Sequence, residues 1–482
     1  MQGYQRTAKG TKPLDKPLDK PEEVPNNLFT KVRTYAMTTS HLASTATQTE
    51  REALESDVIT LCQEMIRIPS VNYGDGKGDE KAISDYVVSK LAEVGIASTV
   101  YESAPGRCNV VARISGSDME RPGLVLHGHL DVVPANADDW SMDPFGGEIR
   151  DGMIWGRGAL DMKNMDAMIL AVARKWARSG YKPPRTIVLV FFADEEAGSL
   201  YGSRWMVKEH PEVFAGCNEA ISEVGGFSVT VENGKRLYFV EAAQKGIHWM
   251  RLTARGRAGH GSMINDENAI TALSQAVTTI GNHEWPQRYT KTVRILFEKV
   301  ARVTGKPYNA EDLRPLLPEI GSMARMIGAT LQNTANPTLL EAGYKANVIP
   351  QSASAVIDGR FLPGYEDEMN ATIRQLVGPD IEVETITRDI SLEVDFEGAL
   401  VDAMCNSILS EDPDGIPVPY LMSGGTDNKA LSDLGIIGFG FSPLKLPPEL
   451  DFASLFHGVD ERVPVDGLKF GVHVLENFLE NC

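Results

Sequence analysis

The feature that most constrains the fold is the apolar run at residues 186–192, TIVLVFF, which a pair of carboxylates follows almost at once. A run of this length and composition is typical of a strand that is buried on both faces of a sheet. Glu195 and Glu196 stand just beyond its end, where two adjacent buried charges are costly unless cations compensate them. The run therefore predicts a covered sheet, and the acidic pair indicates cations at its edge.

Helical and strand patterns alternate on both sides of this run. Apolar residues at three- and four-residue spacing predict a helix that begins near Glu50, and further helices are expected at residues 82–94 and 162–179. Short β-rich runs occupy residues 97–101, 109–114 and 124–126. Alternation of this kind predicts an α/β sandwich.

A different order of elements occurs in the middle of the chain. The patterns predict strand, helix, two strands, helix and strand, an order βαββαβ that describes a ferredoxin-like unit. The predicted elements are residues 247–254, 268–280, 329–342, 352–362, 366–376 and 381–387. The long stretch between the first helix and the second strand must hold extra local structure or a surface excursion.

These patterns divide the chain into three predicted parts. Residues 1–48 repeat Lys-Pro-Leu-Asp and offer nothing to bury, so we expect a disordered extension. Residues 49–243 and 391–482 form the predicted catalytic domain, and residues 244–390 form the predicted inserted domain.

The composition excludes some partners. The 47 basic and 66 acidic residues give a net charge of −19, which repels nucleic acid and acidic membrane surfaces and attracts cations. The five cysteines are far apart and form no CxxC pair, which favours reduced thiols and a cytoplasmic setting. The apolar runs are far shorter than the ~20 residues of a membrane span.

The segment HGHLD follows a predicted strand, at the end where open α/β sheets hold their sites. His129 stands two residues before Asp131, so the carboxylate can accept a hydrogen bond from the ring nitrogen that does not bind metal. We interpret His129 as a metal ligand and Asp131 as the residue that orients it. Taken alone, the segment is equally consistent with a polar strand end.

Three further residues are ambiguous when each is taken alone. Asp161 in GRGALD precedes a predicted helix, where an aspartate more often caps the helix. Glu223 follows an apolar stretch but could be a surface residue. His457 lies in an apolar and acidic neighbourhood, where a lone histidine is more often structural.

The number of ligands makes these residues credible as a set. His129, Asp161 and Glu223 would serve one cation, while Asp161, Glu196 and His457 would serve a second. Glu195 is then left over for proton transfer, which a metal store does not need. The set therefore indicates an enzyme.

Several motifs resemble the M20 family of metallopeptidases and amidohydrolases. The matching segments cover nearly the whole chain from about residue 50, and they are HGHLDVVP, DPFGGEIRDGMIWGRGALDMKN, DEEAGS, GHGS, ANVIP and SGGTDNK. The resemblance implies a zinc-peptidase-like catalytic domain whose inserted βαββαβ unit is a lid that also dimerises. It also implies two Zn²⁺ per subunit, with Co²⁺ or Mn²⁺ as alternatives, and Asp161 as the bridging ligand.

The resemblance further implies roles for residues outside the metal set. Glu195 would be the general base, and His260 of GHGS would reach across a homodimer to polarise the scissile carbonyl. Asn347 and Arg360 of the lid would bind substrate, as would Gly425 and Lys429 of SGGTDNK. In the aminoacylase-like branch the position of Lys429 often carries an arginine, and lysine keeps the charge without the bidentate geometry.

We therefore expect a dizinc hydrolase that cleaves the amide or peptide bond of a small substrate, of the dipeptidase or carboxypeptidase type. An N-acyl amino acid deacylase is the first alternative, and a non-catalytic binding homologue is the second. A serine hydrolase is disfavoured because the chain has no GxSxG segment.

Overall fold

The computed structural model describes residues 48–74 and 76–482. The predicted extension, residues 1–48, lies outside the described residues except for Gln48, at which the first helix begins. This helix, α1 (Gln48–Ile66), buries the six side chains whose spacing predicted it. They are Leu54, Val58, Leu61, Cys62, Met65 and Ile66.

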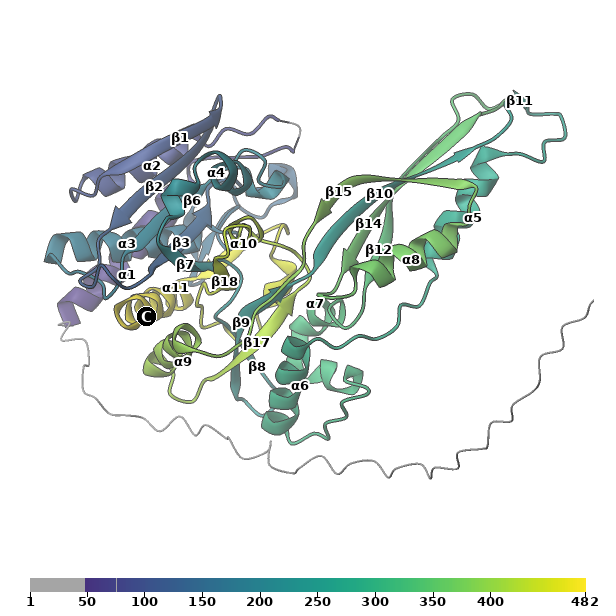
Figure 1. The fold of residues 1–482 in the computed structure, drawn as a ribbon. Helices are drawn as coiled ribbons and strands as arrows, with labels where there is room; N and C mark the ends of the chain where they lie inside the picture. Colours follow the sequence, from purple (N-terminus) through teal and green to yellow (C-terminus); the bar gives the residue numbers. More distant parts are fainter. Residues whose placement is uncertain (1–47, 75) are drawn as a thin grey trace, which may run out of the picture. The chain divides into compact units, whose positions relative to one another are not determined.

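A ten-stranded sheet lies at the centre of the predicted catalytic domain (Figure 1). Its main path runs in the order β1-β2-β6-β3-β7-β18-β9-β16, and β17 and β8 both pair with β9. The strands are β1 (Ser98–Ala104), β2 (Arg107–Ile114), β3 (Gly123–His129), β6 (Ile187–Phe192), β7 (Cys217–Ser222), β8 (Phe227–Thr230), β9 (Arg236–Gln244), β16 (Leu392–Glu393), β17 (Ile416–Met422) and β18 (Ile437–Gly440). The pairs β6–β3, β3–β7 and β7–β18 are parallel.

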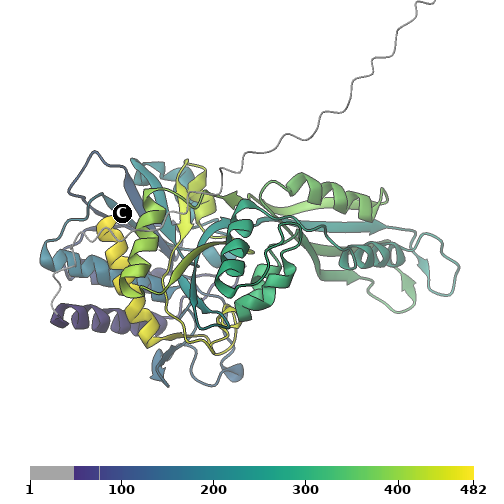
Figure 2. The ribbon, with the colours of Figure 1, turned by 90° about the horizontal axis from the view of Figure 1, so that it is seen from below.

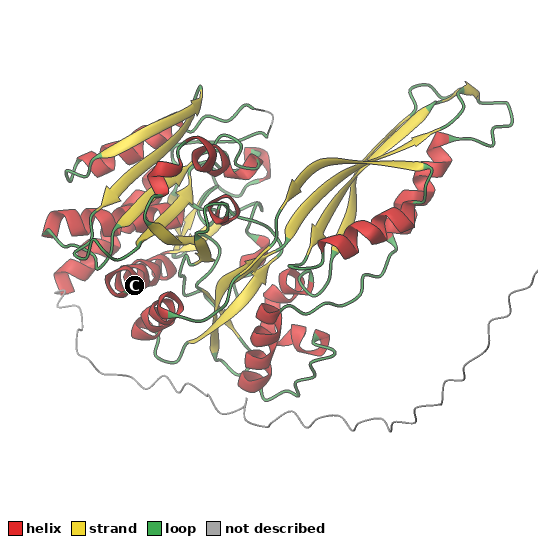
Figure 3. Ribbon diagram, in the orientation of Figure 1, coloured by secondary structure: helices red, strands yellow, loops and turns green. Residues whose placement is uncertain are grey.

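Helices cover this sheet on both faces (Figure 3). The helices α1, α3 and α11 contact one another, α9 contacts α11, and the four lie side by side (Figure 2). The remaining bounds are α2 (Lys81–Ala92), α3 (Lys163–Ser179), α4 (Ser203–Glu209), α9 (Ala399–Glu411), α10 (Asn428–Ser432) and α11 (Val465–Asn481). The 3₁₀ turns are η2 (Ala137–Asp139), η3 (Glu195–Ala197), η4 (Pro211–Phe214) and η6 (Phe452–Ser454).

The strand β6 is buried along its whole length, as the apolar run predicted. Successive side chains point to opposite faces of a sheet. Accordingly Leu189 and Phe191 join the core that contains α1 and α3, while Val190 and Phe192 join the core that contains α4 and α10. The predicted α/β class is confirmed.

A separate four-stranded antiparallel sheet has the order β12-β14-β10-β15. Its elements follow one another as βαββαβ, as predicted, and α5 and α8 pack against each other and share one core with the sheet. The bounds are β10 (Gly246–Arg255), α5 (Ala269–Gly281), β12 (Thr334–Ala342), β14 (Ser352–Phe361), α8 (Glu366–Val377) and β15 (Ile381–Asp389). Smaller sheets pair β11 (Gly259–His260) with β13 (Val348–Ile349), and β19 (Arg462–Pro464) with β5 (Met153–Trp155) and β4 (Glu148–Arg150).

The long stretch between α5 and β12 is helical and returns to the large core. It contains α6 (Lys291–Thr304), η5 (Arg314–Met323) and α7 (Ala324–Gly328). Phe297 and Ile320 pack in the same core as the helices of the ten-stranded sheet, and α6 and α7 both contact β17. This stretch belongs to the predicted inserted domain by its position in the chain, yet it packs in the core of the predicted catalytic domain. The division of the chain at residues 244 and 390 stays a prediction.

The second predicted strand of the inserted unit, residues 329–342, begins later than its sequence suggests. Its first residues form a turn, because Ala329 and Gln332 direct their carbonyl oxygens to the buried ammonium of Lys245, each at 2.9 Å.

All five cysteines are free. Among residues 48–74 and 76–482, no helix has both the length and the apolar character that a membrane span requires.

Candidate metal centre

Three parallel strands bring most of the predicted site residues to one edge of the sheet. β6, β3 and β7 are neighbours, and the carboxyl ends of parallel strands meet at the same edge. His129 is the last residue of β3, Glu195 and Glu196 open the turn after β6, and Glu223 follows β7. The fold therefore gathers these four side chains by topology alone.

Two loops deliver the remaining predicted ligands. Asp161 lies in the connection from β5 to α3, and His457 lies in the loop that precedes β19. Because β5 and β19 pair with each other, with Trp155 opposite Arg462, the two loops are held next to one another.

Each of the five predicted ligands lies within 3.5 Å of at least one other, so that the contacts join them into one cluster. Nε2 of His129 is 3.0 Å from Oδ1 of Asp161 and 3.5 Å from Oε2 of Glu223. Nε2 of His457 is 3.2 Å from Oδ2 of Asp161 and 3.1 Å from Oε2 of Glu196. Asp161 thus belongs to both groups and directs a different oxygen to each histidine.

Glu195 lies beside this cluster. Its carboxylate, a nitrogen of His129 and a carboxylate oxygen of Glu223 lie within 4.8 Å of one another. The side chain of His457 is 55% exposed whereas that of Asp161 is 13% exposed, so the cluster opens to solvent on the His457 side.

Burial and mutual repulsion oppose the ionisation of most of the acidic groups. Burial raises the pKa of Glu195 well above its usual value, and the charge of Glu223 adds to the effect. Burial also raises the pKa of Glu196 and that of Glu223. For Asp161 burial acts in the same direction, but hydrogen bonds with His129 and His457 lower its pKa. This crowding of carboxylates favours divalent cations.

Asp131 contacts His129 mainly through its backbone. Nδ1 of His129 is 3.0 Å from the carbonyl oxygen of Asp131 and 3.5 Å from its Oδ1. The carboxylate instead accepts the backbone N–H groups of Glu195 and Glu196, each at 3.1 Å. The sequence predicted that the carboxylate accepts the hydrogen bond from His129, whereas here the backbone carbonyl of Asp131 is the closer partner and the carboxylate holds the turn that carries the acidic pair.

Asp161 does not cap the helix that follows it. The cap position of α3 is Met162, and no side-chain hydrogen bond caps that helix. The helix-capping alternative is thus not realised, since both carboxylate oxygens of Asp161 face histidines.

Glu461 holds the Asp161 loop and was not identified from the sequence. Its Oε1 accepts the N–H groups of Leu160 and Asp161 at 2.7 and 3.1 Å. Its Oε2 accepts from the N–H of Gly158 at 3.1 Å and from Arg157 at 2.7 Å. Glu461 is fully buried, yet in the sequence it is only an acidic residue four positions after His457. Only the β5–β19 pairing could have indicated its role.

His260 lies on β11 and Asn347 directly precedes β13, the strand that pairs with β11. Both are exposed, and the N–H of Gly261 donates to the carbonyl of Asn347 at 3.0 Å. Nδ1 of His260 is 2.9 Å from Oγ of Ser262. Among the described residues, no hydrogen bond or ion pair links His260 or Asn347 to the five predicted ligands.

The remaining predicted residues make internal contacts. Arg360 forms an ion pair with Asp358, with its Nε 2.6 Å from Oδ1. Lys429 is buried and donates to the carbonyl oxygen of Lys245 at 2.8 Å. A side chain at Gly425 would clash with Lys429, because a Cβ atom there would lie 2.6 Å from Nζ. Lys429 therefore has a structural partner that its sequence position did not reveal.

Comparison with known families gives a single result over most of the chain. The family model described as peptidase family M20/M25/M40 matches residues 125–481. Probable carboxypeptidase S-like 2 of Dictyostelium discoideum is 29% identical over 77% of this chain and 76% of its own length. N-fatty-acyl-amino acid synthase/hydrolase PM20D1 of Xenopus tropicalis is 25% identical over 86% and 84%. Human aminoacylase-1 is 27% identical over 85% and 91%.

Solved structures share the fold. The M20 family metallo-carboxypeptidase Sso-CP2 of Sulfolobus solfataricus has a TM-score of 0.68 and 18% identity, over 88% of this chain and 99% of its own. The YXEP protein of Bacillus subtilis, described as a dinuclear metal binding peptidase, has a TM-score of 0.56 and 14% identity, over 89% and 98%.

We predict that Glu461→Gln destabilises the Asp161 loop. Glutamine keeps the shape of the side chain, but its NH₂ group would face backbone N–H groups that need an acceptor. The free energy of unfolding should fall by about 1–3 kcal/mol, measured by urea denaturation, and the affinity for added Zn²⁺ should fall by about tenfold.

Asp460→Asn is the matched control, because Asp460 is adjacent but its carboxylate accepts from Ser141 at an exposed position. That change should alter stability by at most ~0.5 kcal/mol. Equal effects of the two substitutions would contradict the assigned role of Glu461.

Proposed function

The chain belongs to peptidase family M20/M25/M40 and is a hydrolase of amide bonds, and from this premise we propose a dizinc dipeptidase or carboxypeptidase that acts on small substrates. The observation that carries the proposal is the position of Asp161 between two histidines. Its Oδ1 lies 3.0 Å from Nε2 of His129 and its Oδ2 lies 3.2 Å from Nε2 of His457. A carboxylate placed in this way can serve two cations.

The donor atoms fit two divalent cations. Imidazole nitrogens and carboxylate oxygens are common donors to zinc. His129, Asp161 and Glu223 would hold one ion, and Asp161, Glu196 and His457 would hold the other. Oε1 of Glu196 is buried and has no hydrogen-bond partner among the described residues, as expected of an oxygen that a cation satisfies.

Zn²⁺ is the proposed ion, and Co²⁺ and Mn²⁺ suit similar donors. When bound, the metal pair supplies a Lewis acid that polarises a carbonyl and makes water acidic near neutral pH.

Glu195 is the proposed general base. Neither set of three ligands requires it, although its carboxylate lies within 4.8 Å of donor atoms of His129 and Glu223. In this proposal an oxygen of Glu195 takes a proton from the attacking water and later delivers it to the leaving nitrogen. Its place beside His129 and Glu223, without being needed in either ligand set, suits a carboxylate that exchanges a proton with water held between them.

The relatives also support a second candidate function, the hydrolysis of N-acyl amino acids. Aminoacylase-1 and the N-fatty-acyl-amino acid synthase/hydrolase match this chain at 27% and 25% identity, close to the 29% of the carboxypeptidase S-like protein. Both functions would use the same metal centre. They differ in the group on the carbonyl side of the amide bond, which is an amino acid residue in a peptide and an acyl chain in an N-acyl amino acid. A non-catalytic binding homologue is disfavoured because it would have no use for Glu195.

Turnover should depend on divalent metal and should be fastest with dipeptides. We would load the purified, chelator-treated protein with Zn²⁺, Co²⁺ or Mn²⁺ and measure kcat/KM on dipeptides, N-acetyl amino acids and long-chain N-acyl amino acids. The untreated and metal-free samples are the controls. Faster turnover of acylated amino acids would replace the first proposal with the second, and no turnover with any metal would contradict both.

Glu195→Gln should abolish turnover and leave metal binding intact. The amide cannot accept the proton, so kcat should fall by about 10²–10⁴-fold. Metal content, measured by elemental analysis, should stay at the wild-type value because Glu195 is not a ligand. Turnover at the wild-type rate would remove Glu195 from the mechanism, and loss of one metal would make it a ligand instead.

We also propose a homodimer that forms through the four-stranded sheet. β12 is an edge strand, and Leu339 and Leu340 on it are 61% and 59% exposed. An exposed edge with apolar side chains is a template for pairing with another strand, and two-fold pairing of identical edges closes a dimer. Exposed His260 and Asn347 belong to the same unit, and in a dimer they would serve the site of the other subunit together with Arg360.

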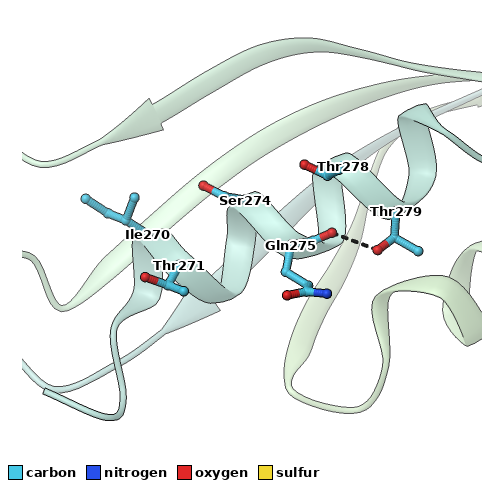
Figure 4. Close-up of a pocket in the computed structure, with 6 residues that line it drawn as sticks. All are labelled: Ile270, Thr271, Ser274, Gln275, Thr278 and Thr279. Atoms are coloured by element: carbon cyan, nitrogen blue, oxygen red, sulfur yellow. Dashed lines mark hydrogen bonds between the residues drawn. The ribbon is translucent and has the colours of Figure 1, made fainter.

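The neighbouring helix offers a surface suited to the same contact. Ile270, Thr271, Ser274, Gln275, Thr278 and Thr279 project from one side of α5 and line a shallow groove of about 450 Å³ (Figure 4). No residue of the metal cluster lines this groove, so it is not the substrate site. Four of the six side chains are serine or threonine, and their small size would allow a second copy to approach closely.

A mixed dimer of Glu195→Gln and His260→Ala subunits should regain activity. Each variant alone should be inactive, but one site of the mixed dimer would combine an intact Glu195 with an intact His260 from the other subunit. Random co-assembly should give about a quarter of wild-type kcat, measured after co-expression. No recovery would contradict the action of His260 across a dimer.

The control is the same mixture carrying Leu339→Lys and Leu340→Lys in both subunits, which should be monomeric by light scattering and inactive. Val383→Lys and Ile386→Lys, on the opposite edge strand β15, are the matched pair and should leave the recovery intact, since both residues are also exposed.

A further inference from the structure

The turn that carries Glu195 and Glu196 requires support from outside itself. Asp194 and Ser199 have φ values of 65° and 63°, a left-handed conformation that side chains other than glycine rarely adopt. The N–H of Ser199 donates to the carbonyl of Asp194 at 2.6 Å, which closes the turn. That bond is internal and does not fix the turn against the sheet.

Two buried carboxylates attach the turn to its surroundings. Asp131 accepts the N–H groups of Glu195 and Glu196, each at 3.1 Å. Asp194 accepts the N–H of Tyr201 through its Oδ2 at 3.0 Å. The hydroxyl of Ser199 adds a bond to buried Asp427 at 2.6 Å, but the N–H groups of the acidic pair themselves depend on where Asp131 is held.

Asn72 joins the two carboxylates. Its side-chain NH₂ group donates to Oδ2 of Asp131 at 2.9 Å and to Oδ1 of Asp194 at 3.0 Å. Its backbone N–H donates to the carbonyl of Val132 at 2.9 Å, which fixes Asn72 beside the segment that carries Asp131. One amide thus sets the distance between the strand end of β3 and the turn after β6.

Arg107 completes the arrangement from the first residue of β2. Its Nη2 donates to Oδ1 of Asp194 at 2.9 Å and to Oδ1 of Asn72 at 3.2 Å, and its Nη1 donates to Glu80. The side chain is 2% exposed, and the ring of Tyr201 covers the guanidinium at 5.5 Å.

The charges explain why an arginine is needed. Glu80, Asp131 and Asp194 are all buried, and Arg107 contacts two of them directly. Burial raises the pKa of Glu80 to about 8, the charges of Asp131 and Asp194 add to this effect, and Arg107 opposes it. Without the guanidinium, buried like charges would push the turn away from the strand end.

We propose that Asn72 and Arg107 are positioning residues that hold the Glu195–Glu196 turn at its working distance from His129. Neither residue has a hydrogen bond or ion pair with the five predicted ligands or with the Glu195 carboxylate in the described part of the chain. They act through Asp131 and Asp194, and Asp131 contacts both the turn and His129. The inference rests on the proposed function, because it assigns Glu195 the proton transfer.

The test uses the full chain with Arg107→Met, which removes the charge and keeps the length, and with Asn72→Ala. A third variant, Arg107→Lys, keeps the charge but cannot bond three acceptors in a fork. We expect the affinity for Zn²⁺ alone, measured by chelator competition, to fall by about 10–100-fold in the first two variants. At saturating Zn²⁺, kcat should fall over a similar range while KM stays within about threefold, and Arg107→Lys should lie between these variants and the wild type.

Arg185→Met is the matched control. Arg185 is equally buried and makes as many contacts, donating to Pro122, Gly123, Asn218 and Glu219, but it precedes β6 at the opposite end from the site. Asn333→Ala is the control for Asn72, since Asn333 is buried and bonded to Tyr365 and Leu362. Both controls should lower Tm without changing kcat or Zn²⁺ affinity of the folded protein.

Equal effects of Arg107→Met and Arg185→Met on kcat and Zn²⁺ affinity would overturn the inference, because both residues would then be merely structural. So would wild-type kcat in folded, metal-loaded Arg107→Met or Asn72→Ala. These outcomes are distinct from failure of the proposed function, which is turnover by Glu195→Gln at the wild-type rate. If Arg107→Met does not fold, Arg107→Lys and Asn72→Ala decide the result.

Discussion

The structure depends on how many carboxylates one edge of a sheet can hold. Asp161, Glu195, Glu196 and Glu223 converge where β3, β6 and β7 end, and two histidines cannot neutralise all of them. Burial raises the pKa of three of these acids, so in the absence of cations the arrangement favours protonation. Only Asp161, which is hydrogen-bonded to both histidines, keeps a lowered pKa. The same crowding that makes the edge unfavourable without cations makes it suited to bind them.

The scaffold holds this edge with further carboxylates. Glu461 accepts three backbone N–H groups of the Asp161 loop, and Asp131 accepts two from the turn after β6. A carboxylate that accepts several N–H groups stabilises a loop whose residues have no regular partner. In both cases the buried acid lies close along the chain to a histidine of the cluster, Glu461 to His457 and Asp131 to His129. Each histidine and the support of the neighbouring loop therefore come from one short segment.

The sequence was sufficient to predict those features of the fold and the site that depend on local apolar patterns and on strand direction. The apolar run before Glu195 predicted the buried strand, and side chains that follow parallel strands were expected at one edge. It could not predict the roles of Glu461, Asn72 or Arg107, because an acidic, amide or basic residue in a loop or at the start of a strand has no local signature of burial. Their partners lie up to 304 positions away, as in the pair Arg157–Glu461. The return of α6 and α7 to the large core was missed for the same reason, since their apolar faces did not reveal which sheet they cover.

Lys429 illustrates how the fold rather than the substrate can determine a residue. The ammonium donates to the carbonyl oxygen of Lys245 at 2.8 Å and lies 3.6 Å from the carboxylate of Asp389. These two partners mark the places where the chain enters β10 and leaves β15, so one side chain contacts both connections to the four-stranded sheet. A single ammonium on a flexible stem suits a narrow space beside Gly425, whereas a planar guanidinium would need more room. Lysine at this position is thus accounted for by the chain's own connections, without a substrate group that it must bind.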